Sequence, residues 1–415
     1  MSDSPKAPTP KLDTQLLHAD QKLRFNGAEV TPSISVSTTF KYPENVGELL
    51  KEEPTFFDPK IHVYSRYTQQ VNTRAEHVLS QLNQGYALTY ASGLSAAYSA
   101  LVHLAPRRIA IRDGYHGCHQ TINVYQKSKD TKVQVIDIND EFREGDICWL
   151  ETPENPTGLT RDIQYYADKI HAVGGKLFID STFGPPPLQY PFKWGADIIL
   201  HSGTKYFGGH SDLLCGVLVV KTEEEWNQVL YYSIGNTLGS LEAWLLLRSL
   251  RTLRLRVTRQ SQTATLLAQW LHQVSKIPEG KTFDGALGGV VKRVHHASLQ
   301  TATKEFDPKE QMEGGWPATF AILLHKQEAA IALPHRLQYF MASHRAATSL
   351  GGVESLIEYR LNSDTKADPT LLRLSIGLED IEDLKADFRQ AFEALASGWK
   401  VRLNVYVMYM HTHND

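Results

Sequence analysis

The chain has 415 residues, a formal net charge of −3 at pH 7 and 42% hydrophobic residues. This length exceeds the size at which one hydrophobic core keeps growing, so we expect two packed units after a short N-terminal extension. The slightly negative charge and the dispersed basic residues argue against nucleic acid or an anionic membrane surface as the main partner. The expected partner is therefore a small molecule.

The N-terminal segment MSDSPKAPTPKLD lacks both an apolar run and an Arg-rich amphipathic pattern, so it predicts a flexible leader without a targeting signal. The most apolar window, residues 87–105, contains Ser, Gly, Tyr and His, which favours a strand and a buried helix over a membrane span. Cys118, Cys148 and Cys215 are odd in number and widely spaced, and they fit no disulfide or zinc pattern. We expect a cytoplasmic protein without a bound metal.

Short apolar runs alternate with helical patterns from about residue 79 to residue 220. Runs that are apolar on both faces are typical of buried strands in a mostly parallel sheet. The predicted strands are RIAIR (108–112), VQVID (133–137), ICWLE (147–151), KLFID (176–180), DIILH (197–201) and GVLVV (216–220). In a doubly wound α/β sheet the ligand lies beyond the carboxyl ends of the strands, so the loops there are the candidate functional segments.

A long helical pattern at residues 239–271 is predicted to link this unit to a second one. From about Lys276 the pattern restarts and indicates a smaller α/β unit, with strand-like WPATFAILLH, a helix near 329–342, strand-like LLRLSIG and a helix at EDIEDLKADFRQAFEAL. The last residues, 400–415, alternate like a strand and have no assigned role. The predicted domains are an N-terminal arm (1–60), a large α/β domain (61–255), a small C-terminal α/β domain (256–398) and a tail (399–415).

The loop HSGTKYFGGHSD, after the predicted strand DIILH, contains the first candidate catalytic residue, Lys205. A lysine that acts as a nucleophile and then as a proton shuttle needs partial desolvation and a nearby anion pocket. Ser202, Thr204 and the adjacent glycines offer hydroxyl and amide donors for a phosphate. A surface lysine in a Gly-rich turn explains the same pattern, and the short motif alone does not decide between them.

Asp180 ends the predicted strand KLFID. A carboxylate at the end of a buried strand is costly unless it is paired, and a protonated pyridine nitrogen is a partner that keeps it ionised. Because this pairing keeps the pyridine ring protonated, the ring can accept the electrons of a carbanion. An Asp that caps the following loop through backbone N–H groups is the alternative. The position of Asp180, about one unit before Lys205 in the same sheet, favours the catalytic interpretation.

Three further loops carry weaker patterns. Asn155 in ETPENPTG offers an amide to a ring hydroxyl, although the flanking prolines also explain a rigid loop. Ser92 in YASGLSA stands at a strand-to-helix junction that suits a phosphate, and a plain N-cap is the alternative. Tyr115 or His116 in DGYHGCHQ can stack on a cofactor ring, as can any partly buried loop aromatic.

Taken together, ordered segments between about residues 30 and 395 resemble the Cys/Met-metabolism enzymes that depend on pyridoxal 5′-phosphate (PLP). This family includes cystathionine γ-synthase, the cystathionine lyases, O-acetylhomoserine sulfhydrylase and methionine γ-lyase. Each motif is weak alone, but their order and spacing make the set specific. The segments are YSR (64–66), YASGLSA (90–96), ETPENPTG (151–158), DSTFGPPPLQ (180–189), HSGTKYFGGHSD (201–212), LEAWLLLRSLRTL (241–253), SLGGVESLI (349–357) and LLRLSIGLED (371–380).

The resemblance implies a PLP-dependent transferase of fold type I. Such a protein has a doubly wound, mostly parallel sheet in its PLP-binding domain, and a smaller C-terminal α/β domain. An N-terminal arm completes the site of a neighbouring subunit, and the usual assembly is a homotetramer made of catalytic dimers. The expected substrate is a small amino acid, and neither nucleic acid nor a membrane is an expected partner.

The resemblance also implies roles for single residues. Lys205, as the Schiff-base lysine, and Tyr115, as the stacking ring, are the implied catalytic residues. Tyr64 and Arg66 match the pair that reaches across a dimer to the neighbour's phosphate. The implied cofactor site also includes the phosphate turn and donors, the ring contacts and the pyridine-nitrogen partner, namely Ser92, Gly93, Leu94, Asn155, Asp180, Thr182, Ser202 and Thr204. The implied substrate site contains Ser349 and Arg373, at the α-carboxylate, and Asn155.

Three segments depart from the family pattern. YSRYTQQVNT replaces YSRxxNPT, and YGGT becomes YHGC or HGCH, with Tyr115 preferred as the stacking ring and His116 as the alternative. EYRLNSD replaces HPAxMTH, near where relatives close over the substrate. The cofactor residues are therefore retained while the surroundings of the second substrate are altered.

We expect γ-replacement on an O-acetyl or O-succinyl L-homoserine, through a vinylglycine ketimine, with a thiol or a carbon nucleophile. A lyase that cleaves C–S bonds in cystathionine, cysteine or methionine shares every cofactor residue and is the first alternative. A PLP-fold subunit that has lost activity and serves in binding is the second. The joint retention of Lys205, Asp180 and Arg373 argues against an inactive subunit.

Overall fold

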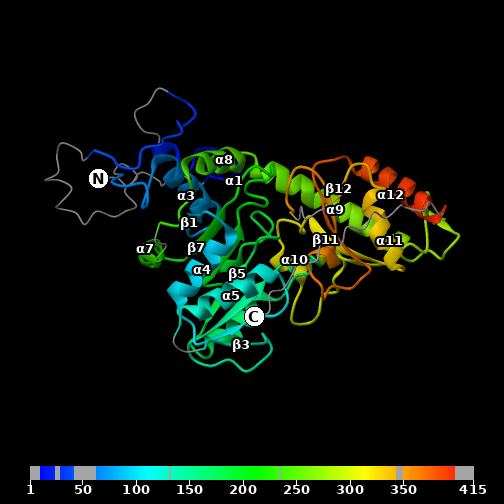
Figure 1. Ribbon diagram of the computed structural model, residues 1–415, viewed down its shortest axis with the longest axis horizontal. Helices are drawn as coiled ribbons and strands as arrows, with labels where there is room; N and C mark the ends of the chain where they lie inside the picture. The colour runs from blue at the N-terminus through cyan, green and yellow to red at the C-terminus, as the bar shows by residue number, and fades with distance from the viewer. Residues whose placement is uncertain are drawn as a thin grey trace, which may run out of the picture.

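The computed structural model describes residues 10–23, 29–41, 62–129, 132–232, 235–342 and 349–397. Within these residues the chain forms two main sheets, which lie side by side along the longest axis of the molecule (Figure 1). The strand-like pattern at 400–415 and much of the predicted N-terminal arm lie outside the described residues. The predicted domain limits stay predictions.

The first sheet has seven strands in the order β1-β7-β6-β5-β4-β2-β3. From β6 to β3 the neighbours are parallel, whereas β7 runs antiparallel to both β6 and β1. The doubly wound, mostly parallel sheet is thus confirmed, and all six predicted strands form, namely β2 (Arg108–Ala110), β3 (Gln134–Ile136), β4 (Asp146–Glu151), β5 (Lys176–Asp180), β6 (Ile198–Ser202) and β7 (Gly216–Val220), together with β1 (Tyr86–Tyr90).

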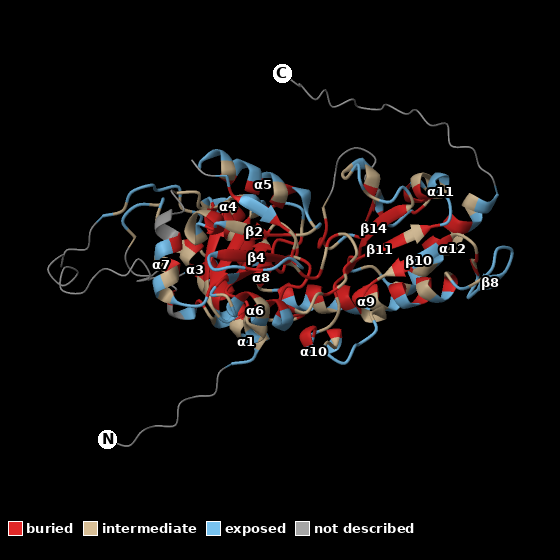
Figure 2. Cartoon of the chain, turned by 90° about the horizontal axis from the view of Figure 1, so that it is seen from below, coloured by how far each residue is buried: buried red, intermediate tan, exposed pale blue. Residues whose placement is uncertain are grey.

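Helices cover both faces of this sheet, which explains why its strands are apolar on both sides. In β5, Leu177 and Ile179 belong to the buried cluster on one face and Phe178 to the cluster on the other face. Figure 2 shows the buried strands between these two helical layers. One layer contains α3 (Gln70–Asn83), α6 (Ile163–His171) and α8 (Ser240–Leu250), and the other contains α4 (Gly93–Leu104), α5 (His116–Lys127) and α7 (Glu223–Tyr232).

The second sheet has five strands in the order β10-β11-β14-β13-β12, and only the β12–β13 pair is parallel. Helices α9 (Leu253–Val274) and α12 (Ile381–Ala396) pack against each other beside it (Figure 1). Its strands are β10 (Val291–His295), β11 (Thr319–Leu324), β12 (Met341–Ala342), β13 (Leu356–Tyr359) and β14 (Leu371–Ser375).

Short elements complete the described chain. Strands β8 (Thr282–Phe283) and β9 (Ala286–Leu287) form a hairpin of their own. None of the helices in the described ranges is long and apolar enough to cross a membrane. The remaining helices are α1 (Leu12–His18), α10 (Pro308–Gln311), α11 (Gln327–Ala332) and the 3-10 helices η1 (Gln21–Leu23), η2 (Pro191–Trp194), η3 (Ala297–Leu299), η4 (Leu333–His335) and η5 (Arg360–Asn362).

The structure corrects two predicted helices. The pattern at 239–271 forms two helices, α8 and α9, because the backbone leaves the helical region at Thr252. Arg251, beside this break, binds Asp20 and the carbonyl of Leu16, so the N-terminal helix α1 docks there. The helix predicted near 329–342 ends with α11, because Pro334 has no N–H with which to continue the helical bonds.

Packing of α12 provides a test of the second unit. The ring of Phe388 is fully buried against Trp270, Phe340 and Phe392. We expect Phe388→Ala to lower the free energy of unfolding by about 3–5 kcal/mol, because it leaves a cavity in a packed core. Urea unfolding measures the loss. Phe283→Ala in the exposed β8–β9 hairpin is the control, and an equal loss in both variants contradicts the packing described.

Candidate active site

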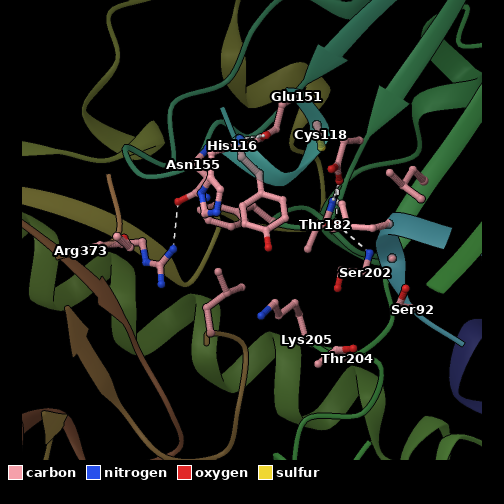
Figure 3. A pocket seen from close by; sticks show the side chains of 18 of the residues that line it. Ser92, His116, Cys118, Glu151, Asn155, Thr182, Ser202, Thr204, Lys205 and Arg373 are labelled. Carbon is pink, nitrogen blue, oxygen red and sulfur yellow. Dashed lines mark hydrogen bonds between the residues drawn. The ribbon is translucent and has the colours of Figure 1, made fainter. Parts of the chain in front are cut away.

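A cavity of about 260 Å³ lies where the carboxyl ends of β4, β5 and β6 face the second sheet (Figure 3). Eleven predicted site residues line it, and they come from both sheets and from the starts of α4 and α5. These residues are Ser92, Gly93, Leu94, Tyr115, Asn155, Asp180, Thr182, Ser202, Thr204, Lys205 and Arg373. The structure thus gathers segments that are far apart in the sequence into one site.

Lys205 lies in the turn after β6, and its side chain is largely withdrawn from solvent. Its Nζ donates a hydrogen bond to Oγ of Ser349 at 3.2 Å, which joins a predicted catalytic residue to a predicted substrate-binding residue. Burial and the nearby Arg373 guanidinium lower the pKa of Lys205 to about 8, while Glu358 opposes the shift. A substantial fraction of Lys205 is therefore neutral, and hence nucleophilic, near physiological pH.

Asp180, which is buried, and Glu151, which is partly exposed to the cavity, form a pair of carboxyl groups at the ends of neighbouring strands β5 and β4. Oδ1 of Asp180 accepts hydrogen bonds from the backbone N–H and the hydroxyl of Thr182, at 3.0 and 2.6 Å. Burial raises the pKa of Asp180, and burial together with the charge of Asp180 raises that of Glu151 to about 8. A cation placed against Asp180 removes much of this electrostatic cost.

Hydroxyl and amide groups gather at the end of the cavity that lies away from Arg373 (Figure 3). Ser92 caps α4, where its side chain accepts from the N–H of Ser95 at 3.1 Å, so the plain N-cap is present. A Cβ on Gly93 would lie 3.1 Å from Cβ of Ser202, which explains why a residue without a side chain stands there. The start of α4 thus faces the end of β6, and its free N–H groups and dipole favour an anion.

Tyr115 precedes α5, and its N–H donates to Oε2 of Glu151 at 2.7 Å. Tyr115 and His116, the alternative stacking residue, both line the cavity, and their ring centroids are 4.8 Å apart. Gly114 has a φ of +76°, and a Cβ there would lie 2.4 Å from Oε2 of Glu151. A Cβ on Gly117 would lie 2.4 Å from the Tyr115 ring. The two glycines therefore allow the tyrosine to lie over the cavity.

Arg373 enters the cavity from β14 and is almost fully buried. Its Nη1 donates to Oδ1 of Asn155 at 3.0 Å (Figure 3). Its Nη2 donates to the carbonyl of Ser349 at 3.2 Å. Glu358, its Cα partner on β13, places Oε2 2.5 Å from Nη2. The predicted substrate residues thus form one hydrogen-bonded group around a guanidinium that can bind a carboxylate.

Tyr64 and Arg66 do not line the cavity of their own chain. Tyr64 is 41% exposed, and Arg66 lies with its guanidinium 4.8 Å from the centre of the Tyr67 ring. Nη2 of Arg66 donates to the Tyr67 hydroxyl at 3.1 Å. Their role toward a neighbouring subunit stays a prediction.

The structure adds cavity residues to which the sequence analysis gave no role. Glu151 carries the same signal in the sequence as Asp180, a carboxylate at the end of a buried strand, and this signal is sufficient to predict it as a site residue. The segment EYRLNSD was noted only as a departure, although Arg360 and Ser363 within it line the cavity. The other additional lining residues are Cys118, Phe183, Leu200, Leu214 and Leu350.

The residues present fit pyridoxal phosphate. One end of the cavity offers donors for a phosphate, and Lys205 offers an amine for an aldehyde. A cationic pyridine nitrogen beside Asp180 would lower the electrostatic cost of placing the carboxyl groups of Asp180 and Glu151 together. These requirements coincide in one cavity, so the donor set suits this cofactor.

A doubly wound sheet with a desolvated lysine, a buried carboxylate and a helix N-terminus at its carboxyl edge defines a PLP enzyme of fold type I. Residues 13–393 match the model of the Cys/Met metabolism PLP-dependent enzyme family. The chain therefore belongs to this family of PLP-dependent enzymes, which act in transsulfuration.

Relatives with different reactions are about equally similar to the chain. Cystathionine γ-lyase of Dictyostelium discoideum is 31% identical, with 92% of this chain and 98% of the relative covered. Cystathionine β-lyase MetC of Bacillus subtilis is 30% identical, with 93% and 97% covered. The structure of cystathionine γ-synthase from Xanthomonas oryzae pv. oryzae, in complex with aminoacrylate and cysteine, superposes with a TM-score of 0.78 at 26% identity, covering 94% of this chain and all of that one.

The carboxyl pair of Asp180 and Glu151 makes the thermal stability of the protein depend on pH. The pKa of Glu151 is about 8 in the folded protein, against an ordinary value of 4.5, so the folded state holds an extra proton between these values. We therefore expect the Tm of the cofactor-free protein to fall as the pH rises from about 4.5 to about 8. Circular dichroism measures this slope. Glu151→Gln should flatten it and exposed Glu144→Gln should not, whereas an unchanged slope in Glu151→Gln refutes the assignment.

The lowered pKa of Lys205 predicts the pH dependence of cofactor attachment. The neutral amine reacts with the aldehyde, so the rate at which the cofactor-free enzyme takes up pyridoxal phosphate should rise with pH and level off above about 8. Stopped-flow absorbance follows the reaction. Because Glu358 raises the pKa of Lys205, Glu358→Gln should move the midpoint to lower pH, and a shift in the other direction contradicts the electrostatics described.

Proposed function

We propose that this enzyme catalyses γ-replacement on an O-acetyl or O-succinyl L-homoserine, with a thiol or a carbon nucleophile. The observation that carries the proposal is the meeting of Lys205 and Arg373 at Ser349. Nζ of Lys205 donates to the hydroxyl of Ser349, and Arg373 donates to its carbonyl, each at 3.2 Å. A substrate whose α-carboxylate binds Arg373 would therefore have its Cα–H bond close to Nζ of Lys205.

In this proposal each side chain has its own role in the reaction. Pyridoxal phosphate, when bound, supplies an electron sink that stabilises a carbanion at Cα of an amino acid. Lys205 would take a proton from Cα and another from Cβ, so that the acyloxy group leaves Cγ as acetate or succinate. It would return protons to Cβ and Cα after the nucleophile has added at Cγ. Asp180 keeps the pyridine nitrogen protonated, and Tyr115 stacks on the ring.

C–S bond cleavage is the second candidate, because two of the most similar relatives are a cystathionine γ-lyase and a cystathionine β-lyase. Both reactions use the same cofactor residues. Replacement is favoured by the segment EYRLNSD, which departs from the family pattern and places Arg360 and Ser363 in the cavity. Polar side chains there suit a polar or charged second reactant.

We further propose that identical subunits form catalytic dimers, and pairs of dimers, in which Tyr64 and Arg66 of one subunit reach the phosphate of the next. Both side chains are exposed, and neither lines the cavity described above. Arg66 offers a planar fork of donors that suits a phosphate. The limits of the PLP-binding unit (61–255) and of the smaller unit (256–398) belong to the same proposal.

Mass spectrometry of products tests the reaction. Incubation of the holoenzyme with O-acetyl-L-homoserine and sulfide, cysteine or an enolisable keto acid should give a γ-substituted amino acid. Lys205→Ala should lose at least about 10²-fold in rate, since it removes the proton shuttle. Release of 2-oxobutyrate or pyruvate with ammonia from cystathionine, without use of any added nucleophile, would establish the lyase instead.

A further inference from the structure

Arg360 is a second guanidinium in the cavity, beside the one that holds the α-carboxylate. It stands in η5 directly after β13, is 2% exposed and lines the cavity together with Arg373. It belongs to the segment EYRLNSD, which departs from the pattern HPAxMTH. A buried arginine in a ligand cavity requires an explanation, because desolvation of its charge is costly.

The internal partners of Arg360 occupy only one edge of its guanidinium. Nη1 donates to Oγ of Ser363 at 3.1 Å and lies 3.6 Å from Oε2 of Glu358. Glu358 is itself engaged, since Oε2 contacts Arg373 at 2.5 Å and Oε1 accepts from Ser363 at 2.6 Å. Two guanidinium groups, those of Arg360 and Arg373, thus share the one carboxylate of Glu358.

The other edge of the Arg360 guanidinium has no acceptor for its Nε–H group. Nε is buried and has no hydrogen-bond partner among the described residues. Buried donors in native proteins are almost always paired, so an unpaired one beside a ligand cavity indicates a group that arrives with the ligand. Nε and Nη2 together present the fork that binds a carboxylate through two parallel hydrogen bonds.

The position of Arg360 fits a carboxylate other than the α-carboxylate. The Arg373 group already combines Asn155, Ser349 and Glu358 around one guanidinium. Arg360 also acts on Tyr115: burial raises the pKa of that phenol, and the charges of Arg360 and Arg373 oppose the rise. Arg360 therefore lies in the same cavity as Tyr115, the residue predicted to stack on the ring, and close enough to act on its charge.

We propose that Arg360 binds a second carboxylate of the reactants, distinct from the α-carboxylate that Arg373 holds. The carboxylate comes either from the acyl leaving group, as in a succinyl ester, or from the incoming nucleophile, as in a keto acid or a mercapto acid. The source of this carboxylate rests on the proposed function, whereas its binding to Arg360 does not. Arg360 is then a specificity-determining residue that selects reactants with a distal negative charge.

Binding without turnover tests the carboxylate itself. Calorimetric titration of the holoenzyme with L-2-aminoadipate and L-norleucine compares amino acids with and without a distal carboxylate. Arg360→Met should weaken the binding of L-2-aminoadipate by about 10- to 100-fold, as expected for a charge-assisted hydrogen-bonded pair, and should change that of L-norleucine less than about twofold. Arg360→Lys should give an intermediate loss, since it keeps the charge without the fork.

The matched control is Arg259→Gln, which removes an exposed guanidinium that pairs with Asp380 at 3.6 Å, and it should leave both affinities unchanged. Equal weakening of both amino acids by Arg360→Met would overturn the proposal, since Arg360 would then only position Glu358 and Arg373. Unchanged affinities would overturn it as well. Arg360→Lys carries the test if Arg360→Met does not fold.

Turnover then identifies the source of the carboxylate. The variants are assayed with O-succinyl and O-acetyl L-homoserine, each with methanethiol, and with the O-acetyl ester and mercaptoacetate. A loss in kcat/KM confined to the succinyl ester assigns the leaving group, and a loss confined to mercaptoacetate assigns the nucleophile. An equal loss in all three reactions contradicts the proposal. If none of the three reactions proceeds, the proposed γ-replacement fails, while the titrations still decide the role of Arg360.

Discussion

The hydrogen bond from Arg373 to Asn155 joins the two sheets across the cavity, over a separation of 218 residues in the chain. Arg373 belongs to β14 of the second sheet, and Asn155 to the loop after β4 of the first. The N–H of Asn155 donates to Oε1 of Glu151 at 2.6 Å, so the bond extends to the carboxyl pair at the first sheet's edge. The site therefore depends on how the two units pack.

The cavity separates charge along its length. Ser92, at the N-terminus of α4, and Arg373 lie at opposite ends of the cavity, and Glu151 lies between them (Figure 3). Asp180 and Arg360 also line the cavity. Lys205 lies among these groups, and its desolvation keeps it reactive. In the proposed arrangement the N-terminus of α4 would bind a phosphate, Asp180 a cationic ring nitrogen and Arg373 a carboxylate, and these charges would orient the cofactor and the amino acid before any bond changes.

The retained and the altered parts of the site lie on different elements. The proposed cofactor residues lie at the starts of α4 and α5 and at the ends of strands in the first sheet, where hydrogen bonds between neighbouring strands hold the backbone. The altered segment, 358–364, starts on the short strand β13 and continues through η5, beside the substrate region. Such an arrangement lets the surroundings of the substrate change while the carbanion chemistry is preserved.

The sequence by itself determined the family, the cofactor and the strands of the first sheet, because apolar runs and short loop motifs are local patterns. The sequence pattern predicted two helices wrongly. One is interrupted at Thr252, where the N-terminal helix α1 docks on the neighbouring Arg251, and the other ends early because of Pro334. Only the tertiary structure decided that Glu151 faces Asp180 and that Arg360 shares Glu358 with Arg373. Burial and pairing depend on distant segments, and no local spacing encodes them.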